Sequence, residues 1–302
     1  MKIEHGIYSV LMTPFNNDYG IDFNSYDKLL QKIYESNITG VVALGTTSEA
    51  PTLSLNEKII LVKYLWKKFN GNKKVVVGIG GNNTYETLNF ALKIKDYCDY
   101  MMITVPNYNK PSQKGIQKHF EFVCNHEQLK NKPFVLYNVP SRCGVNLEPI
   151  TISEVYNSCE NVCAVKEASG SLEQALNIRS LCDIQIFSGD DSLTVPIMSI
   201  GGCGVISVIA NILPNVINEI YNDCVKSNYS SASREYVKLH KLVKTLFIES
   251  NPVPGKELLK LVNIFSNSTP RLPLVKMSNK NKEILFSRYY EYGNDISSIE
   301  LE

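Results

Sequence analysis

Eight short apolar runs, rich in β-branched residues, recur along the first two-thirds of the chain and constrain its fold more than any other feature. Most are apolar almost throughout, as expected of parallel strands that are covered on both faces. Their starts lie 33, 35, 25, 34, 28, 22 and 20 residues apart, which leaves room for a helix after each one. The runs are 7–12, 40–44, 75–79, 100–105, 134–139, 162–165, 184–187 and 204–209.

Helix-start signals lie between these runs, so the chain alternates strand and helix. Eight βα units of this kind predict an α/β fold, a closed (β/α)8 TIM barrel. The competing interpretation is a doubly wound sheet, which usually carries a Gly-rich phosphate turn after its first strand, whereas here the first run leads into TPFNND. Three residue pairs have the spacing of a capping box: Ser54 with Glu57, Thr151 with Glu154, and Ser171 with Gln174.

The pattern changes beyond about residue 211, where helical periodicity replaces the apolar runs. A length of 302 residues alone would suggest two domains. We predict instead a catalytic barrel over 1–225, a C-terminal helical extension over 226–295 and a flexible tail over 296–302. Five apolar residues of the extension are expected on one helical face: Leu239, Leu242, Val243, Leu246 and Phe247.

Charge argues against a polyanionic or membrane partner. Lys and Arg total 31 against 30 Asp and Glu, a net charge of +1, so we expect no nucleic-acid partner.

Residues 192–218 carry no charge, but Pro196, Gly201 and Pro214 interrupt them. This segment therefore predicts a helix, a turn and a buried strand, and we expect no membrane span.

The eight cysteines form no C-x-x-C pair, and no histidine lies at metal-ligand spacing from them. We therefore expect no metal site. The apolar stretch 7–12 is too short for the core of a signal peptide. Free thiols and a cytoplasmic location are the expectation.

Polar residues cluster directly after the ends of the apolar runs. In a (β/α)8 barrel the carboxyl ends of the strands lie on one face, where active sites are built. The pattern therefore predicts one site made from several loops. The clusters are 45–49, 107–109, Tyr137 with Arg142, 166–167 and 189–191.

Lys166 is the central candidate, because it follows the buried run 162–165. Desolvation disfavours the ammonium form and lowers the pKa of such a lysine. A neutral amine there can attack a ketone and form a Schiff base, an electron sink for carbanion chemistry. The alternative is a lysine that pairs with Glu167 at the strand end, and the run alone leaves both open.

Four further residues suit carbonyl chemistry through an imine. Tyr137 offers an acid–base hydroxyl, although a strand tyrosine can equally be core packing. Arg142 has a guanidinium fork that suits a carboxylate, with a surface arginine as the alternative. Thr46 and Thr47 offer hydroxyl and N–H groups to a small anion, or simply form a turn.

Eight motifs, in this order along the chain, resemble the dihydrodipicolinate synthase family. This is the branch of pyruvate-dependent class I aldolases that also contains N-acetylneuraminate lyase. The resemblance runs from TPF near residue 13 to RLPL and leaves out only the tail. The motifs are GTTSEAPTLS (45–54), NYNKPS (107–112), YNVPSRCGV (137–145), VKEASG (165–170), SGDD (188–191), GGCGVISVIAN (201–211), ESNPVPGK (249–256) and RLPL (271–274).

The resemblance implies a role for each residue of a proton relay. Lys166 matches the lysine that forms the Schiff base with pyruvate, and Tyr137 the tyrosine that moves protons to and from that imine. Thr46 matches the relay threonine, and Thr47 its neighbour at the pyruvate carboxylate. Tyr108 matches the tyrosine that reaches the relay from an adjacent subunit, which implies an oligomer, typically a homotetramer built as a dimer of dimers.

The resemblance also implies the binding residues and the branch of the family. Gly189 and Ile206 match positions that line the pyruvate pocket. Arg142 matches the arginine that receives the carboxylate of aspartate semialdehyde in the synthases, whereas neuraminate lyases usually have an apolar residue there. Asn82 and Glu86 match members of an allosteric lysine site.

Several positions depart from the family pattern. Ser48 stands where Gly or Ala is common, and Asn107 replaces an aromatic residue that usually precedes Tyr108. Leu55 and Lys58 occupy places that are often histidine in relatives, which argues against lysine feedback. Gly255 also differs from the commoner NPIPVK-type run.

The expected enzyme is a carbon–carbon lyase-type synthase of lysine/diaminopimelate biosynthesis that needs no metal or other cofactor. It condenses pyruvate with L-aspartate 4-semialdehyde to 4-hydroxy-tetrahydrodipicolinate through the imine on Lys166. The first alternative is cleavage of N-acetylneuraminate or a 2-keto-3-deoxy sugar acid through the same imine. A minor alternative is a non-catalytic barrel used for binding or assembly.

Overall fold

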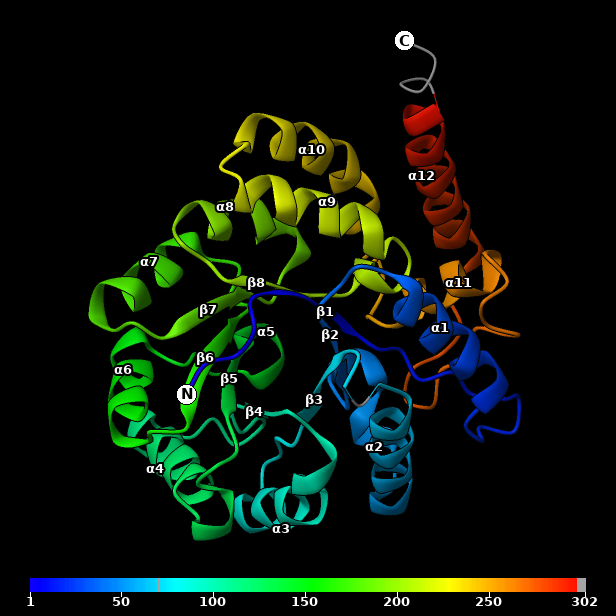
Figure 1. The fold of residues 1–302 in the computed structure, drawn as a ribbon. Coiled ribbons are helices and arrows are strands. Elements are labelled where there is room, and N and C mark those ends of the chain that lie inside the picture. Colours follow the sequence, from blue (N-terminus) through cyan, green and yellow to red (C-terminus); the bar gives the residue numbers. More distant parts are fainter. Residues whose placement is uncertain (70, 298–302) are drawn as a thin grey trace.

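The computed structural model describes residues 1–69 and 71–297, and it contains a closed barrel of eight parallel strands in sequence order (Figure 1). Each predicted apolar run overlaps one strand, and the strand interiors are buried. The predicted fold class is therefore confirmed. The strands are β1 Gly6–Val10, β2 Gly40–Ala43, β3 Lys74–Gly78, β4 Tyr100–Thr104, β5 Phe134–Asn138, β6 Val162–Glu167, β7 Gln185–Ser188 and β8 Gly204–Ser207.

Helices connect successive strands and surround the barrel (Figure 1). Short 3-10 turns and the one-turn helix α5 (Pro140–Cys143) lie between strands and helices. The connecting helices are α1 Phe23–Glu35, α2 Leu55–Phe69, α3 Thr84–Ile94, α4 Gln113–Cys124, α6 Pro149–Ser158, α7 Leu172–Leu181 and α8 Thr194–Ser199, and α9 Pro214–Val225 follows the last strand. The 3-10 turns are η1 Thr46–Ser48, η2 Ala50–Thr52, η3 Lys95–Tyr97, η4 Glu127–Leu129, η5 Asp191–Leu193 and η6 Ile209–Asn211.

Two of the three predicted helix starts are confirmed. The Ser54 and Glu57 side chains each accept the other residue's backbone N–H, at 3.2 and 2.8 Å. Ser171 caps α7 by accepting the N–H of Gln174 at 3.2 Å. The third prediction is wrong, because α6 begins earlier, with a proline in its first turn at Pro149. The φ angle of proline suits that position, so Thr151 lies inside the helix.

The segment after the barrel is helical, with α10 Tyr229–Thr245, α11 Val253–Leu261 and α12 Asn279–Ser297. α10 lies beside α9, and α12 extends away from the barrel (Figure 1). Leu239, Leu242, Val243 and Leu246 are buried as predicted, but Phe247 is 47% exposed because it lies beyond the end of α10. The division into barrel and extension stays a prediction, and the predicted tail falls mostly outside the described residues.

The uncharged segment 192–218 contains α8, β8 and η6, and then α9 begins. It is thus helix, turn and buried strand, as predicted. Among the described helices, none combines the length and the apolar character that crossing a membrane requires. All eight cysteines are free thiols, and Cys182 is the most exposed of them.

The barrel closes where β1 and β8 pair, and two glycines make this closure possible. Gly6 is aligned with Gly204, and their φ angles of +136° and +145° are rarely adopted by L side chains. A Cβ atom on Gly204 would collide with the backbone carbonyl of Gly6. Because both sides of this contact are backbone, no flexible side chain can move aside to relieve the collision.

We expect Gly204→Ala to lower the free energy of unfolding by about 2–4 kcal/mol, because it combines overpacking with an unfavourable φ. Gly293→Ala is the matched control, since nothing lies within 4 Å of a Cβ at that helical position. It should raise stability by about 0.5–1 kcal/mol. Urea denaturation of both variants measures the difference, and equal stabilities would contradict this explanation of the closure.

Candidate active site

A cavity of about 430 Å³ opens at the carboxyl ends of the barrel strands. Six of the predicted site residues line it, although they come from five different loops and strands. The structure therefore brings together residues that are far apart in the sequence. The six residues are Thr46, Thr47, Tyr137, Arg142, Lys166 and Gly189.

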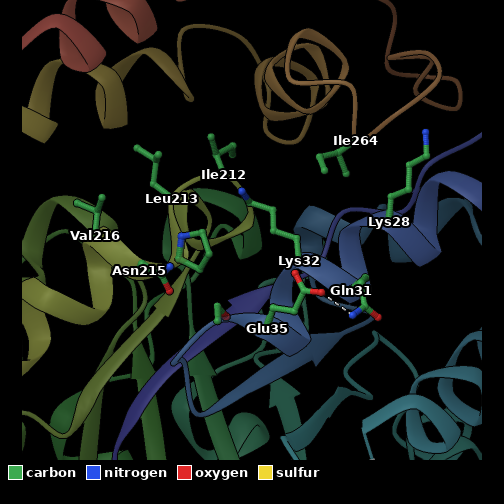
Figure 2. Close-up of a pocket in the computed structure, with 11 residues that line it drawn as sticks. Lys28, Gln31, Lys32, Glu35, Ile212, Leu213, Asn215, Val216 and Ile264 are labelled. Carbon is green, nitrogen blue, oxygen red and sulfur yellow. Dashed lines mark hydrogen bonds between the residues drawn. The ribbon is translucent and has the colours of Figure 1, made fainter. Parts of the chain in front are cut away.

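A second cavity, of about 620 Å³, lies on the outer wall between α1 and the start of α9. Figure 2 shows Lys28 and Lys32 of α1 on one side and Leu213 and Val216 on the other. None of the residues predicted from the strand ends is among its lining residues in the described chain. This cavity is larger than the one at the strand ends, but the predicted chemical groups line the smaller cavity.

Lys166 lies in β6 with its side chain buried, and its Cα is aligned with that of Tyr137 on β5. Its Nζ atom is 4.2 Å from the centre of the Tyr137 ring. Burial lowers the pKa of Lys166 from 10.5 to about 7, with the charge of Asp191 opposing this shift and that of Arg142 adding to it. A substantial fraction of this amine is therefore neutral, and nucleophilic, near neutral pH.

Glu167, the alternative partner of Lys166, is engaged elsewhere. Its carboxylate accepts the Asn138 amide at 3.1 Å, the Ser169 N–H at 2.6 Å and the Gln174 amide at 2.9 Å. Consecutive strand residues point to opposite faces, which keeps Glu167 away from the cavity that Lys166 lines. Of the two interpretations left open by the sequence, the geometry favours the buried amine.

Tyr137 is buried beside Lys166 and shares a hydrogen bond with Thr46. Burial raises the pKa of its phenol to about 12, although Arg142 and the Thr46 hydrogen bond act in the opposite direction. A phenol with this pKa is protonated at neutral pH and can donate a proton to an oxygen on the carbon that the lysine amine attacks. Thr46 belongs to the turn η1, so its hydrogen bond connects the Tyr137 phenol to that turn.

The turn η1 carries both predicted threonines and is held from several sides. Thr47 is 3% exposed, and its Oγ1 accepts the side-chain amide of Asn251 at 2.9 Å. Ser48, the departure from the family pattern, is also buried and donates its hydroxyl to the Leu11 carbonyl at 2.6 Å. The extra hydroxyl thus ties the turn to the end of β1.

Asp191 belongs to the predicted cluster 189–191 but was given no role there, and it lies between Asp190 and Ser192, which line the cavity. Its carboxylate accepts the backbone N–H groups of Val208 at 2.9 Å and Ile209 at 3.1 Å, and it is 3% exposed. These bonds join the loop after β7 to the end of β8. Its charge also raises the pKa of Lys166. The SGDD motif contained this signal, but a sequence does not show which aspartate turns inward.

Three lining residues come from the region after the barrel and were also missed. Lys244, Phe247 and Asn251 line the cavity although they lie in or after α10. Asn251 belongs to the ESNPVPGK motif, so a signal for it existed. Phe247 was assigned only to a helical face and Lys244 was not singled out, because periodicity does not show where the end of a helix lies relative to the barrel.

Four predicted residues lie outside this cavity. Tyr108 is 84% exposed with a φ of +67°, and Ile206 is 1% exposed within β8. Glu86 lines a separate cavity of about 440 Å³ together with Lys58, whereas Asn82 is exposed and does not line it. Among residues 1–69 and 71–297, no group of three or more His, Cys, Asp or Glu side chains is arranged to hold a metal.

Comparison with known proteins finds relatives that match this chain over nearly its full length. The 4-hydroxy-tetrahydrodipicolinate synthase of Endomicrobium trichonymphae is 40% identical over 290 residues, which cover 95% of this chain and 98% of that protein. The solved structure of the enzyme of the same name from Methylacidiphilum fumariolicum SolV is 31% identical with a TM-score of 0.94, and the match covers 99% of both chains.

A third relative was solved with a ligand. The chloride-inhibited dihydrodipicolinate synthase of Acinetobacter baumannii, complexed with pyruvate, is 31% identical with a TM-score of 0.91, over 97% of this chain and 99% of that one. The matches confirm the predicted activity, that of a 4-hydroxy-tetrahydrodipicolinate synthase, and the predicted enzyme type, a class I aldolase. The model of the dihydrodipicolinate synthetase family matches residues 4–288, and the chain belongs to that family.

Proposed function

We propose that this chain condenses pyruvate with L-aspartate 4-semialdehyde through a Schiff base on Lys166. The observation that carries the proposal is the buried amine of Lys166, 4.2 Å from the Tyr137 ring, in a cavity that Arg142 also lines. The relative from Acinetobacter baumannii was solved with pyruvate, which supports pyruvate as the first substrate.

The first half-reaction makes the imine. The neutral amine of Lys166 attacks the keto carbon of pyruvate, and water leaves as the carbon–nitrogen double bond forms. Tyr137 supplies a proton to the departing oxygen, and Thr46 is the next group of the relay. Thr47 and the N–H groups of its turn bind the pyruvate carboxylate.

The second half-reaction makes the carbon–carbon bond. Tyr137, which gave up its proton in the first half-reaction, takes a methyl proton and converts the imine to an enamine. The enamine carbon attacks the aldehyde of the second substrate, and Tyr137 returns the proton to the aldehyde oxygen, which becomes a hydroxyl. Arg142 holds the carboxylate of that substrate in its guanidinium fork. The amino group of the same substrate then attacks the imine carbon, which closes the ring and frees the Lys166 amine. No step of this sequence calls on a metal or another cofactor.

The alternative activities fit the site less well. A neutral sugar chain would not need the cation at Arg142, which disfavours cleavage of N-acetylneuraminate or a 2-keto-3-deoxy sugar acid. The presence of Lys166, Tyr137, Thr46 and Tyr108 disfavours a non-catalytic barrel. The condensation uses Lys166, Tyr137 and Thr46, and Tyr108 is the group that the relay would take from another subunit.

We propose an oligomer, a homotetramer built as a dimer of dimers. Tyr108 supports it, because this 84% exposed tyrosine with a left-handed φ does not line the cavity of its own subunit but can extend to the relay of another. For the allosteric lysine site at Asn82 and Glu86, the Lys58 ammonium lines the same cavity as the Glu86 carboxylate. The positive charge of Lys58 would repel a free lysine molecule at this site, so we expect that lysine does not inhibit the enzyme.

Incubation with pyruvate and sodium borohydride should leave a reduced adduct on Lys166, because reduction makes the imine permanent. Peptide mass spectrometry locates the adduct, and borohydride without pyruvate is the control. Lys166→Met should carry no adduct and show no turnover. An unmodified Lys166 in active protein would contradict the proposed imine.

Arg142→Leu should raise the KM for aspartate semialdehyde by about 10- to 100-fold, the value of losing a hydrogen-bonded charge pair. Imine trapping with pyruvate should persist. Arg179→Leu on α7 is the matched control, since that arginine donates to the Gly201 carbonyl at 3.1 Å and does not line the cavity. Steady-state assays with aspartate semialdehyde and with sugar acids measure the preference, and an unchanged preference would remove the basis for choosing this second substrate.

A further inference from the structure

The turn that carries Thr46 and Thr47 ends at Glu49, and a buried ion pair holds this residue. Glu49 has a left-handed φ of 54°. Its carboxylate forms an ion pair with the ammonium of Lys256, a residue of α11, and it also accepts the backbone N–H of Arg271 at 2.8 Å. The two side chains of the ion pair are 1% and 0% exposed, so water does not screen their interaction.

The environment of Lys256 leaves it no other acidic partner among the described residues. Its Nζ donates to the Thr269 carbonyl at 3.2 Å and lies 4.3 Å from the centre of the Phe15 ring. The Arg271 guanidinium lies 4.4 Å from the same ring and is itself paired with Glu57. The Lys256 ammonium is therefore neutralised in one geometry, beside the Glu49 carboxylate, and that geometry fixes the position of Glu49.

The same short stretch of chain holds the turn at a second point. Asn251 lies five residues before Lys256 in the motif ESNPVPGK and donates its side-chain amide to Thr47 Oγ1 at 2.9 Å. That bond occupies an acceptor site of the hydroxyl and leaves its proton available to an anion in the cavity. The turn is thus held at its middle by Asn251 and at its end by Lys256.

Stability alone does not account for the ion pair. Removing two charges from water costs about as much as their attraction returns, and buried pairs can often be replaced by apolar side chains without loss. A charge pair does impose one geometry, however, whereas an apolar contact tolerates small shifts. Its place directly after the two threonines suggests that this geometry serves the turn.

We propose that Lys256 and Glu49 form a positioning pair that sets the Thr46–Thr47 turn, so that the region after the barrel is part of the catalytic apparatus. This inference rests on the roles proposed above for Thr46 and Thr47. Thr46 would lose its alignment in the relay without the pair, and Thr47 its place at the pyruvate carboxylate. Arg142 is held on α5 and would not be affected.

The double variant Glu49→Gln/Lys256→Met tests the proposal, because it removes both charges together and avoids an unpaired buried charge. We expect a melting temperature near that of the wild type, a pyruvate KM raised about 10- to 100-fold and a lower kcat, as a displacement of about 1 Å would produce. The KM for aspartate semialdehyde should not change. Glu49→Gln alone, which keeps an acceptor for Arg271, should show the same kinetic pattern if the double variant folds poorly.

Lys282→Met is the matched control. It removes another ion pair of α11, between Lys282 and Glu257 at 3.2 Å, which does not contact the turn. We expect a loss of stability, because the buried Glu257 carboxylate loses its cation, together with wild-type kinetics. Wild-type kinetics in a folded Glu49→Gln/Lys256→Met or Glu49→Gln protein would overturn the positioning role, and so would equal changes in both KM values. Failure of the wild type to trap pyruvate would instead overturn the proposed function itself.

Discussion

The site depends on the removal of one amine from water. Lys166 lies at the end of a buried strand with an aromatic ring 4.2 Å from its nitrogen, and this burial lowers its pKa to about 7. Asp191 and Arg142 act on that charge in opposite directions, so the final pKa reflects a balance that the loops around β7 and β5 maintain. If Lys166 were solvated, it would be a protonated side chain with no nucleophilic role.

The closed barrel holds Lys166 and Tyr137 in place beside each other. Parallel pairing aligns Tyr137 with Lys166 across β5 and β6, so the acid–base group and the nucleophile are neighbours by register. Loop contacts then add groups from distant strands. Asp191 joins the loop after β7 to β8, and Ser48 joins the turn after β2 to β1. Hydrogen bonds between neighbouring loops therefore hold the rim of the barrel together around the cavity.

Local sequence patterns were sufficient for the strands and for the residues at their ends. Apolar runs and strand spacing predicted the barrel, although β6 extends beyond its run to include Lys166 and Glu167. Helix starts were less certain, because a proline such as Pro149 can begin a helix before an apparent cap. The inward turn of Asp191 depends on backbone groups of another strand, so no local pattern shows it.

Contacts between the barrel and the region after it could not be predicted from the sequence. Asn251 and Thr47 are 204 residues apart, and their bond depends on how the helices after β8 return to the rim. Lys256 and Glu49 look like ordinary surface charges in the sequence, yet both are buried. Although the length of the chain suggested two domains, the barrel and the region after it contribute residues to one site.

The most direct test of the central claim is the pKa of Lys166 itself. NMR titration of protein with isotope-labelled lysine, assigned by comparison with Lys166→Met, would follow its side chain from low to high pH. We expect a midpoint near 7, because burial removes the solvation of the ammonium. A midpoint near 10.5, the value of a solvated lysine, would contradict the claim that burial produces the nucleophile.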